Sequence, residues 1–162
     1  ETIKEYPNLI VVKSISKSYG VPGLRLGVLA CSNEEYNSKI KKTNSIWNIN
    51  SFAEYYLQIY EKYSKTYSAA CDSIANERKR FITELSNIKN IKVFNSQSNF
   101  ILCRLDGKIL ASELASILIE KYNIFIKDLT GKKCFDDGRC IRLAIRDEQD
   151  NNTLIKALKE TL

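Results

Sequence analysis

One lysine in this chain of 162 residues, Lys17, stands where a side-chain amine could do covalent chemistry. It follows the apolar run Leu9–Val12, which is bounded by turn residues and predicts a buried strand. Burial disfavours the charged form of a lysine and frees its lone pair for attack on a carbonyl carbon. Lys17 is therefore a candidate nucleophile at the mouth of a strand.

The residues around Lys17 are of the kinds that hold phosphate groups. Two hydroxyls flank the lysine, those of Ser14 and Ser16, and Arg25 follows on the same segment, with glycines at positions 20, 23 and 27. Hydroxyls, exposed backbone N–H groups and a guanidinium all donate hydrogen bonds to phosphate. An amine beside such donors suggests an aldehyde cofactor that carries a phosphate, pyridoxal 5′-phosphate. The plainer alternative is a lysine on a surface turn, with Arg25 solvated.

The segment from Ser14 to Gly27 resembles the Schiff-base signature of the class I and II aminotransferases, which are pyridoxal-phosphate enzymes of fold type I. Their pattern reads Ser-x-(Ser/Thr)-Lys and then Gly-Leu-Arg-x-Gly, and every fixed position is present here. The strongest resemblance is to the subgroup that contains histidinol-phosphate aminotransferase and threonine-phosphate decarboxylase. It extends over nearly the whole chain.

This resemblance implies a role for each polar residue of the segment. Lys17 would hold the cofactor as a Schiff base and, once an amino-acid substrate displaces it, would move the proton at the substrate Cα. Arg25 would bind the cofactor phosphate through its planar fork, with the hydroxyls of Ser14 and Ser16 as further donors.

The resemblance also implies substrate-binding residues farther along the chain. Arg142 matches the arginine that binds the substrate α-carboxylate, and Asn50 ends a loop that has a counterpart in the family. Lys127 departs from the pattern, because threonine-phosphate decarboxylase has an arginine at the matching place. A lysine keeps the charge but loses the planar fork, so it leaves the substrate open among amino acids and amino-acid phosphates.

Three functions remain open on this basis. The family favours a pyridoxal-phosphate-dependent aminotransferase, and the first alternative is a decarboxylase of a phosphorylated amino acid. The two reactions share their residues and differ in which Cα bond stands perpendicular to the cofactor ring. The second alternative is an inactive C-terminal fragment that serves as a structural or interface unit. Family members are usually homodimers, and the contact is expected near the loop 47–50 and the helical stretch after it.

The implied fold class is α/β, in two parts. Residues 1–63 are expected to form the end of the fold type I large domain, with a mainly parallel sheet, and residues 64–162 a small C-terminal domain with a mixed or antiparallel sheet. The chain begins with Glu1 and contains no methionine, so it is expected to be roughly the C-terminal half of a longer protein. The aromatic ring and the aspartate that contact the cofactor ring in the family would then lie upstream.

Hydrophobic periodicity and capping residues predict the elements that carry these groups. A strand is expected at 24–31, then a helix capped by Ser32 or Asn33 that runs to about Lys42, then a loop over 43–50. Ser51 opens a long helical stretch with a break near 63–65, and its tyrosines, at helical spacing, are expected in a core or interface. Beyond it, strands are expected at 91–94, 99–105, 124–126 and 139–145, and helices at 109–122 and 147–162.

Composition narrows the partners and the compartment. The net charge of +6 is spread along the chain, so no nucleic-acid partner is expected. The sequence has no histidine, and its five cysteines form no Cys-x-x-Cys pair, so no metal site is expected. No apolar run approaches the ~20 residues of a membrane span, and unpaired cysteines are typical of reducing compartments, so a cytoplasmic protein is expected.

Overall fold

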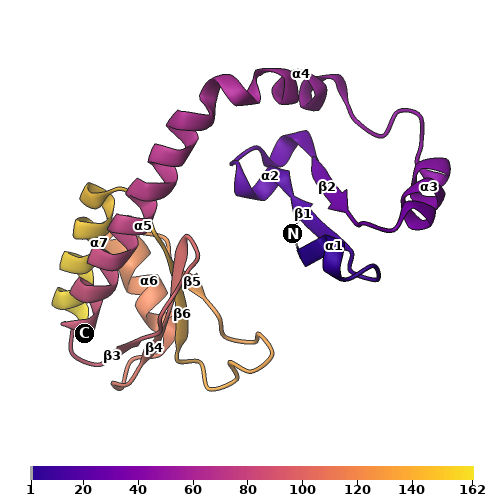
Figure 1. The fold of residues 1–162 in the computed structure, drawn as a ribbon. Helices are drawn as coiled ribbons and strands as arrows, with labels where there is room; N and C mark the ends of the chain where they lie inside the picture. The colour runs from indigo at the N-terminus through magenta and orange to yellow at the C-terminus, as the bar shows by residue number, and fades with distance from the viewer. Residues whose placement is uncertain (1) are drawn as a thin grey trace. The chain divides into compact units, whose positions relative to one another are not determined.

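The computed structural model describes residues 2–162, which form two compact units (Figure 1). The first unit ends at Tyr67, and the second comprises Ser68–Leu162. The first unit contains α1 (Thr2–Glu5), β1 (Val11–Ser14), α2 (Ile15–Ser18), the 3-10 turn η1 (Pro22–Leu24), β2 (Gly27–Ala30), α3 (Glu34–Thr43), α4 (Ser51–Ile59), the 3-10 turn η2 (Tyr60–Tyr63) and the beginning of α5 (Ser64–Ser86).

The strands of the first unit form an antiparallel pair, with Val11 opposite Ala30 and Ser14 opposite Gly27. The prediction of a buried strand before Lys17 is wrong for the described residues, because every residue of β1 is exposed and Val12 retains 73% of its accessible surface. A two-stranded ribbon cannot bury its own faces. The mainly parallel sheet expected here does not occur among residues 2–162, where every ladder is antiparallel.

Asparagine side chains cap two helices of the first unit, α3 and α4. The Asn33 Oδ1 accepts a hydrogen bond from the Tyr36 backbone N–H at 3.1 Å and caps α3, as predicted. The Asn50 Oδ1 accepts from the Ala53 N–H at 3.0 Å and caps α4 in the same way. Each cap satisfies a backbone donor that the first helical turn leaves unpaired. The predicted break in the long helical stretch is present as η2, a few residues earlier than expected.

The second unit is an antiparallel sheet with helices packed on it. Its strand order is β3-β4-β6-β5, all antiparallel, which agrees with the predicted antiparallel option. After α5, the elements are β3 (Ile91–Val93), β4 (Phe100–Leu105), α6 (Ala111–Tyr122), β5 (Lys127–Asp128), β6 (Cys140–Ala144) and α7 (Glu148–Thr161). The strand expected at 124–126 begins later, at Lys127, because the chain first leaves α6 through Asn123 in a left-handed conformation with φ 55°.

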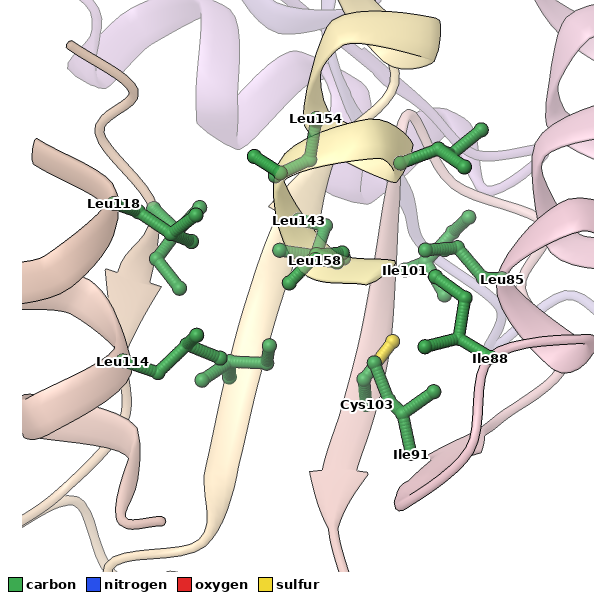
Figure 2. Packing of buried hydrophobic residues seen from close by; sticks show 14 of the residues in the cluster. Leu85, Ile88, Ile91, Ile101, Cys103, Leu114, Leu118, Leu143, Leu154 and Leu158 are labelled. Atoms are coloured by element: carbon green, nitrogen blue, oxygen red, sulfur yellow. The ribbon is translucent and has the colours of Figure 1, made fainter. Parts of the chain in front are cut away.

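The core of this unit lies between the sheet and its helices (Figure 2). Leu85 of α5, Leu114 and Leu118 of α6, and Leu154 and Leu158 of α7 meet the inward face of the strands. That face alternates as a strand should, so that Ile101, Cys103 and Leu105 are buried in β4 while their neighbours are not. The other face of β4 and β6 carries Arg104 and Arg142 beside the apolar residues Phe100, Leu102 and Ala144.

Within residues 2–162, no helix combines the length and the apolar character that a membrane crossing needs. The same residues contain no cluster of three or more side chains suited to hold a metal ion.

Candidate functional site

Lys17 lies in α2, the single helical turn that follows β1 directly. Its side chain is exposed, and it makes no hydrogen bond or ion pair with any described residue. The expectation that burial would desolvate this amine is therefore wrong for residues 2–162. The position at the end of a strand, however, is the one that the sequence predicts.

Ser16 anchors the turn that carries Lys17. Its hydroxyl donates to the Leu26 carbonyl at 3.1 Å and accepts from the Leu26 N–H at 2.7 Å. The same carbonyl accepts the backbone N–H groups of Ile15 at 3.0 Å and of Ser16 at 3.1 Å. Ser16 is only 3% exposed, so its hydroxyl is occupied in fastening α2 to the residue after Arg25. This geometry does not support Ser16 as a hydrogen-bond donor to a phosphate. It identifies Ser16 as a structural anchor.

Ser14 differs from Ser16, because its hydroxyl is unused. Ser14 stands at the N-cap of α2 but makes no capping bond through its side chain, and the residue is exposed. Its carbonyl accepts a hydrogen bond from the Ser18 hydroxyl at 3.1 Å. The Ser14 hydroxyl is therefore available to a ligand next to Lys17.

Arg25 adopts a left-handed backbone conformation, with φ 53° and ψ 38°. A non-glycine residue in this region carries a cost of about 1–3 kcal/mol, and such residues gather at functional sites. The exposed guanidinium makes one hydrogen bond, from Nη1 to the Pro22 carbonyl at 3.3 Å, which leaves its other N–H groups for a ligand. Because Leu26 is bonded to Ser16, the turn that carries Arg25 is tied to the turn that carries Lys17.

Asn50 supports the Arg25 turn from a distant part of the chain. Its Nδ2 donates to the Leu24 carbonyl at 2.9 Å, while its Oδ1 caps α4. Both ends of the amide are engaged within the protein, so the geometry favours a positioning role over direct contact with a substrate. No local pattern predicts the Leu24 contact, since it joins residues 26 positions apart.

A group of tyrosines holds the other side of the Lys17 turn. The Tyr67 hydroxyl donates to the Ser18 carbonyl at 2.7 Å. The ring of Tyr19 contacts the Tyr67 ring at 4.5 Å between centroids and the Tyr60 ring, edge to face, at 5.0 Å. The sequence predicted that the tyrosines of this stretch belong to a core or interface, but not that they contact the residues next to Lys17.

Arg142 and Lys127 belong to the second unit and share one face of its sheet. They are opposite each other in the β5–β6 ladder, and both are exposed. The Arg142 guanidinium also lies over the Phe100 ring, 5.1 Å from its centroid. The two cations that the resemblance assigns to the substrate are thus brought together by strand pairing.

A partly buried polar network in the second unit was not predicted from the sequence. Glu77 of α5 accepts two hydrogen bonds from Arg80, at 2.8 and 2.7 Å, and a third from the Asn151 Nδ2 at 2.7 Å. Asn151 is 1% exposed and also bonds both the N–H and the carbonyl of Arg146. The Arg80 hydrogen bonds lower the pKa of Glu77, with Asn151 adding to the effect and burial opposing it.

The described residues of the first unit therefore combine an unpaired amine, an unused hydroxyl and a guanidinium with free donors, all on two turns fastened together through Leu26. In its neutral form a lysine amine can attack a carbonyl carbon, and the other two groups can bind an anion.

Comparison with known proteins gives consistent matches. The family model described as aminotransferase class I and II matches residues 1–158. The L-serine phosphate decarboxylase of Sulfurospirillum multivorans is 35% identical over 159 residues, which cover 97% of this chain and 40% of that protein. The histidinol-phosphate aminotransferase of Caldanaerobacter subterraneus subsp. tengcongensis is 31% identical over 99% of this chain and 43% of that protein.

Solved structures agree with these sequence matches. A decarboxylase from Sulfurospirillum multivorans superposes with a TM-score of 0.84 at 34% identity, covering 99% of this chain and 46% of the other. The histidinol-phosphate aminotransferase from Clostridium acetobutylicum has a TM-score of 0.84 at 36% identity, covering 98% of this chain and 47% of the other. The chain thus spans less than half the length of each relative.

Proposed function

This chain belongs to the class I and II aminotransferase family, whose members depend on pyridoxal 5′-phosphate, and we propose that the whole protein is an aminotransferase of an amino acid or amino-acid phosphate. The observation that supports this most is the setting of Lys17. Its amine is exposed and unpaired among the described residues, on a turn fastened to the turn that carries Arg25.

The residues of the first unit fit the cofactor chemically. Lys17 provides the amine that would hold the cofactor carbonyl carbon, and the free donors of Ser14 and Arg25 would bind its phosphate. Ser16 and Asn50 would support these groups from behind, through Leu26 and Leu24. When bound, the cofactor supplies an electron sink for a carbanion at the substrate Cα.

The protein's own part in the reaction would centre on the Lys17 Nζ. Once the substrate amine has taken its place, the freed Lys17 amine can remove the proton from the substrate Cα and return it elsewhere. One side chain can do both tasks because a neutral amine is a nucleophile and a base.

Arg142 and Lys127 would bind the acidic groups of the substrate. We assign the α-carboxylate to Arg142, whose planar fork suits it, and a phosphate or second acidic group to Lys127. Two exposed cations directly opposite each other repel, and an anionic substrate would relieve that repulsion.

Decarboxylation of a phosphorylated amino acid is the second candidate function. It is favoured by the similarity to an L-serine phosphate decarboxylase, at 35% identity over 97% of this chain. An inactive fragment with a structural or interface role is the remaining alternative, and the uncovered faces of β1 and β2 are the feature that favours it.

We propose that residues 1–63 belong to the cofactor-binding large domain and 64–162 to the small domain. We also propose a cytoplasmic homodimer. The five free cysteines suit a reducing compartment. The apolar side chains of Ile46, Trp47, Ile49 and Phe52, close together in the sequence, are all exposed and available for a subunit contact.

The deciding experiment uses the full-length protein incubated with pyridoxal phosphate and reduced with borohydride. Peptide mass spectrometry should then find the reduced cofactor on Lys17, and Lys17→Ala should abolish the adduct. A protein that carries no adduct on Lys17 would contradict the proposal and favour the inactive fragment. Assay of a phosphorylated amino acid for keto acid against carbon dioxide would separate aminotransferase from decarboxylase.

A further inference from the structure

We propose that Tyr67 is a positioning residue for Lys17: its hydroxyl and ring hold the C-terminal end of the turn that carries the lysine. The catalytic part of this inference rests on the proposed function, whereas the anchoring part does not. Tyr67 is the last residue of the first unit, so its contact with Ser18 lies inside that unit.

The turn itself has little stability of its own. α2 comprises four residues, and its helical hydrogen bond at the C-terminal end runs from the Tyr19 N–H to the Ile15 carbonyl at 3.0 Å. Helix nucleation is unfavourable, and isolated helices of this length do not persist in water. The conformation at Lys17 therefore depends on contacts from other parts of the chain.

Those contacts hold the residues on both sides of Lys17. On the N-terminal side, Ser16 is fastened to Leu26 through its side chain and its backbone. On the C-terminal side, the Ser18 carbonyl accepts the Tyr67 hydroxyl at 2.7 Å, which is a short and therefore well-formed bond. Lys17 is thus the exposed residue between two fixed neighbours.

The ring of Tyr67 adds a second contact to the same end of the turn. It lies 4.5 Å from the Tyr19 ring, whose other neighbour, Tyr60, is 5.0 Å away in an edge-to-face arrangement. Lys13 of β1 also lies over the Tyr19 ring, at 5.6 Å. Aromatic pairs at these distances contribute beyond their buried area, so Tyr19 is fixed by its ring as Ser18 is by its carbonyl.

A lysine that must first hold a cofactor and then reach the substrate Cα needs a backbone that stays in place. Because Tyr67 touches the backbone beside Lys17 and not the reacting atoms, it acts through Lys17. Loss of its hydroxyl should impair the reaction itself more than the binding of substrate.

Tyr67→Phe in the full-length protein tests this, since it removes the hydroxyl and keeps the ring. Tyr36→Phe is the matched control, because Tyr36 lies in α3 and its side chain makes no hydrogen bond or ring contact with the Lys17 turn. In cofactor-free protein, hydrogen exchange of the segment 16–25 should become about five- to tenfold faster in Tyr67→Phe, as expected for the loss of one hydrogen bond. It should be unchanged in Tyr36→Phe.

In protein loaded with the cofactor, Tyr67→Phe should shift the pH midpoint of the visible absorbance of the Lys17-bound cofactor. It should also lower kcat by about tenfold at constant KM. A purely structural role would change the melting temperature without moving the pH midpoint. Should Tyr67→Phe fail to fold, Tyr19→Leu, which removes the ring contact, is expected to act in the same direction.

Equal rates of hydrogen exchange for the segment 16–25 in Tyr67→Phe and in the wild type would overturn the inference. An unchanged pH midpoint in the loaded variant would overturn it too. If the wild type takes up no cofactor on Lys17, the proposed function fails, and the exchange measurement on cofactor-free protein still decides whether Tyr67 anchors the turn.

Discussion

Lys127 in β5 and Arg142 in β6 stand directly opposite each other in the antiparallel ladder that joins the two strands. Both side chains project from the exposed face of the sheet, opposite the core that its other face forms with α5, α6 and α7. Like charges in this arrangement are destabilising. A pair that costs stability in the unliganded protein is a reasonable place for an anionic ligand.

Replacing Lys127 by glutamine should weaken the binding of a phosphorylated substrate. We expect KM for an amino-acid phosphate to rise about tenfold, because one charge-assisted contact is lost, while KM for the same amino acid without the phosphate changes little. The unfolding free energy should rise by ~0.2–1 kcal/mol as the repulsion from Arg142 is removed. Steady-state kinetics with both substrates, and urea denaturation, measure the two effects.

Lys92→Gln is the control for Lys127. Lys92 stands opposite Arg104 in the β3–β4 ladder of the same sheet, so its replacement also removes one cation from that sheet, at a place where the arginine is already paired with Asp106 and Asp137. If Lys92→Gln raises KM as much as Lys127→Gln does, the effect comes from the general charge of the sheet, and Lys127 has no specific role.

Asn50→Asp separates the two tasks of the Asn50 amide. An aspartate is as good an N-cap as an asparagine, so α4 should form normally, but it has no donor for the Leu24 carbonyl. We expect the Arg25 turn to loosen and the dissociation constant of pyridoxal phosphate to rise by about fivefold or more, measured by fluorescence titration of the full-length protein.

The same substitution at the cap of α3 serves as its reference. Asn33→Asp changes an asparagine that caps a helix but does not bond to the Arg25 turn. It should leave the cofactor affinity as it is in the wild type. Equal affinities in Asn50→Asp and Asn33→Asp would contradict the supporting role of Asn50.

Glu77→Gln should destabilise the second unit in a manner that depends on pH. The pKa of Glu77 is lowered in the folded state, chiefly by its hydrogen bonds with Arg80, so the ionised carboxylate stabilises the fold above its unfolded pKa of about 4.5. That contribution is lost as the pH falls through the folded-state pKa. The variant should therefore be about 1–3 kcal/mol less stable at pH 7, with a smaller difference in strong acid.

Chemical denaturation of both proteins across this pH range measures the difference. Glu35→Gln provides the comparison, because Glu35 pairs with Lys39 at 2.7 Å but both side chains are about 70% exposed. Such a surface pair contributes little, and its loss should change stability by less than ~0.5 kcal/mol at any pH. A Glu77→Gln variant whose deficit does not shrink in acid would argue against the ionised network.

Trp47→Ser tests the proposed homodimer. Trp47 is 88% exposed beside Ile46, which is 90% exposed, so a subunit contact here would bury a large aromatic side chain. We expect the dimer dissociation constant of the full-length protein to rise about 30-fold, by sedimentation analysis. Phe125→Ser, at a residue 81% exposed in the second unit, should leave it unchanged. Undisturbed dimers in Trp47→Ser would place the contact elsewhere.

Local sequence signals predicted many of the elements but not their surroundings. The cap at Asn33, the break after α4 and the alternating strand β4 follow from residue type and periodicity, which act over a few residues. The burial of β1 was predicted wrongly, because burial depends on what packs against a strand. An apolar run indicates only that a strand could be covered.

The candidate site shows the same division. The identities and spacing of Ser14, Lys17 and Arg25 point to the family and to the cofactor, because a covalent amine and phosphate donors must occur as particular residue types. From the sequence, Ser14 and Ser16 have the same predicted role as phosphate-binding hydroxyls. Only the fold distinguishes the two roles, because the Ser16 hydroxyl bonds to Leu26 while the Ser14 hydroxyl stays free.

Residue types and their local spacing were thus enough to indicate the family, the order of most of the elements and the side chains that we propose to react. Only the tertiary structure decided which partner each side chain has. Asn50 bonds to the Leu24 carbonyl, Tyr67 bonds to the Ser18 carbonyl, and Lys127 stands opposite Arg142. The reason is physical. Each of these relationships joins residues far apart in the chain or depends on strand register, and neither is encoded in any short stretch of sequence.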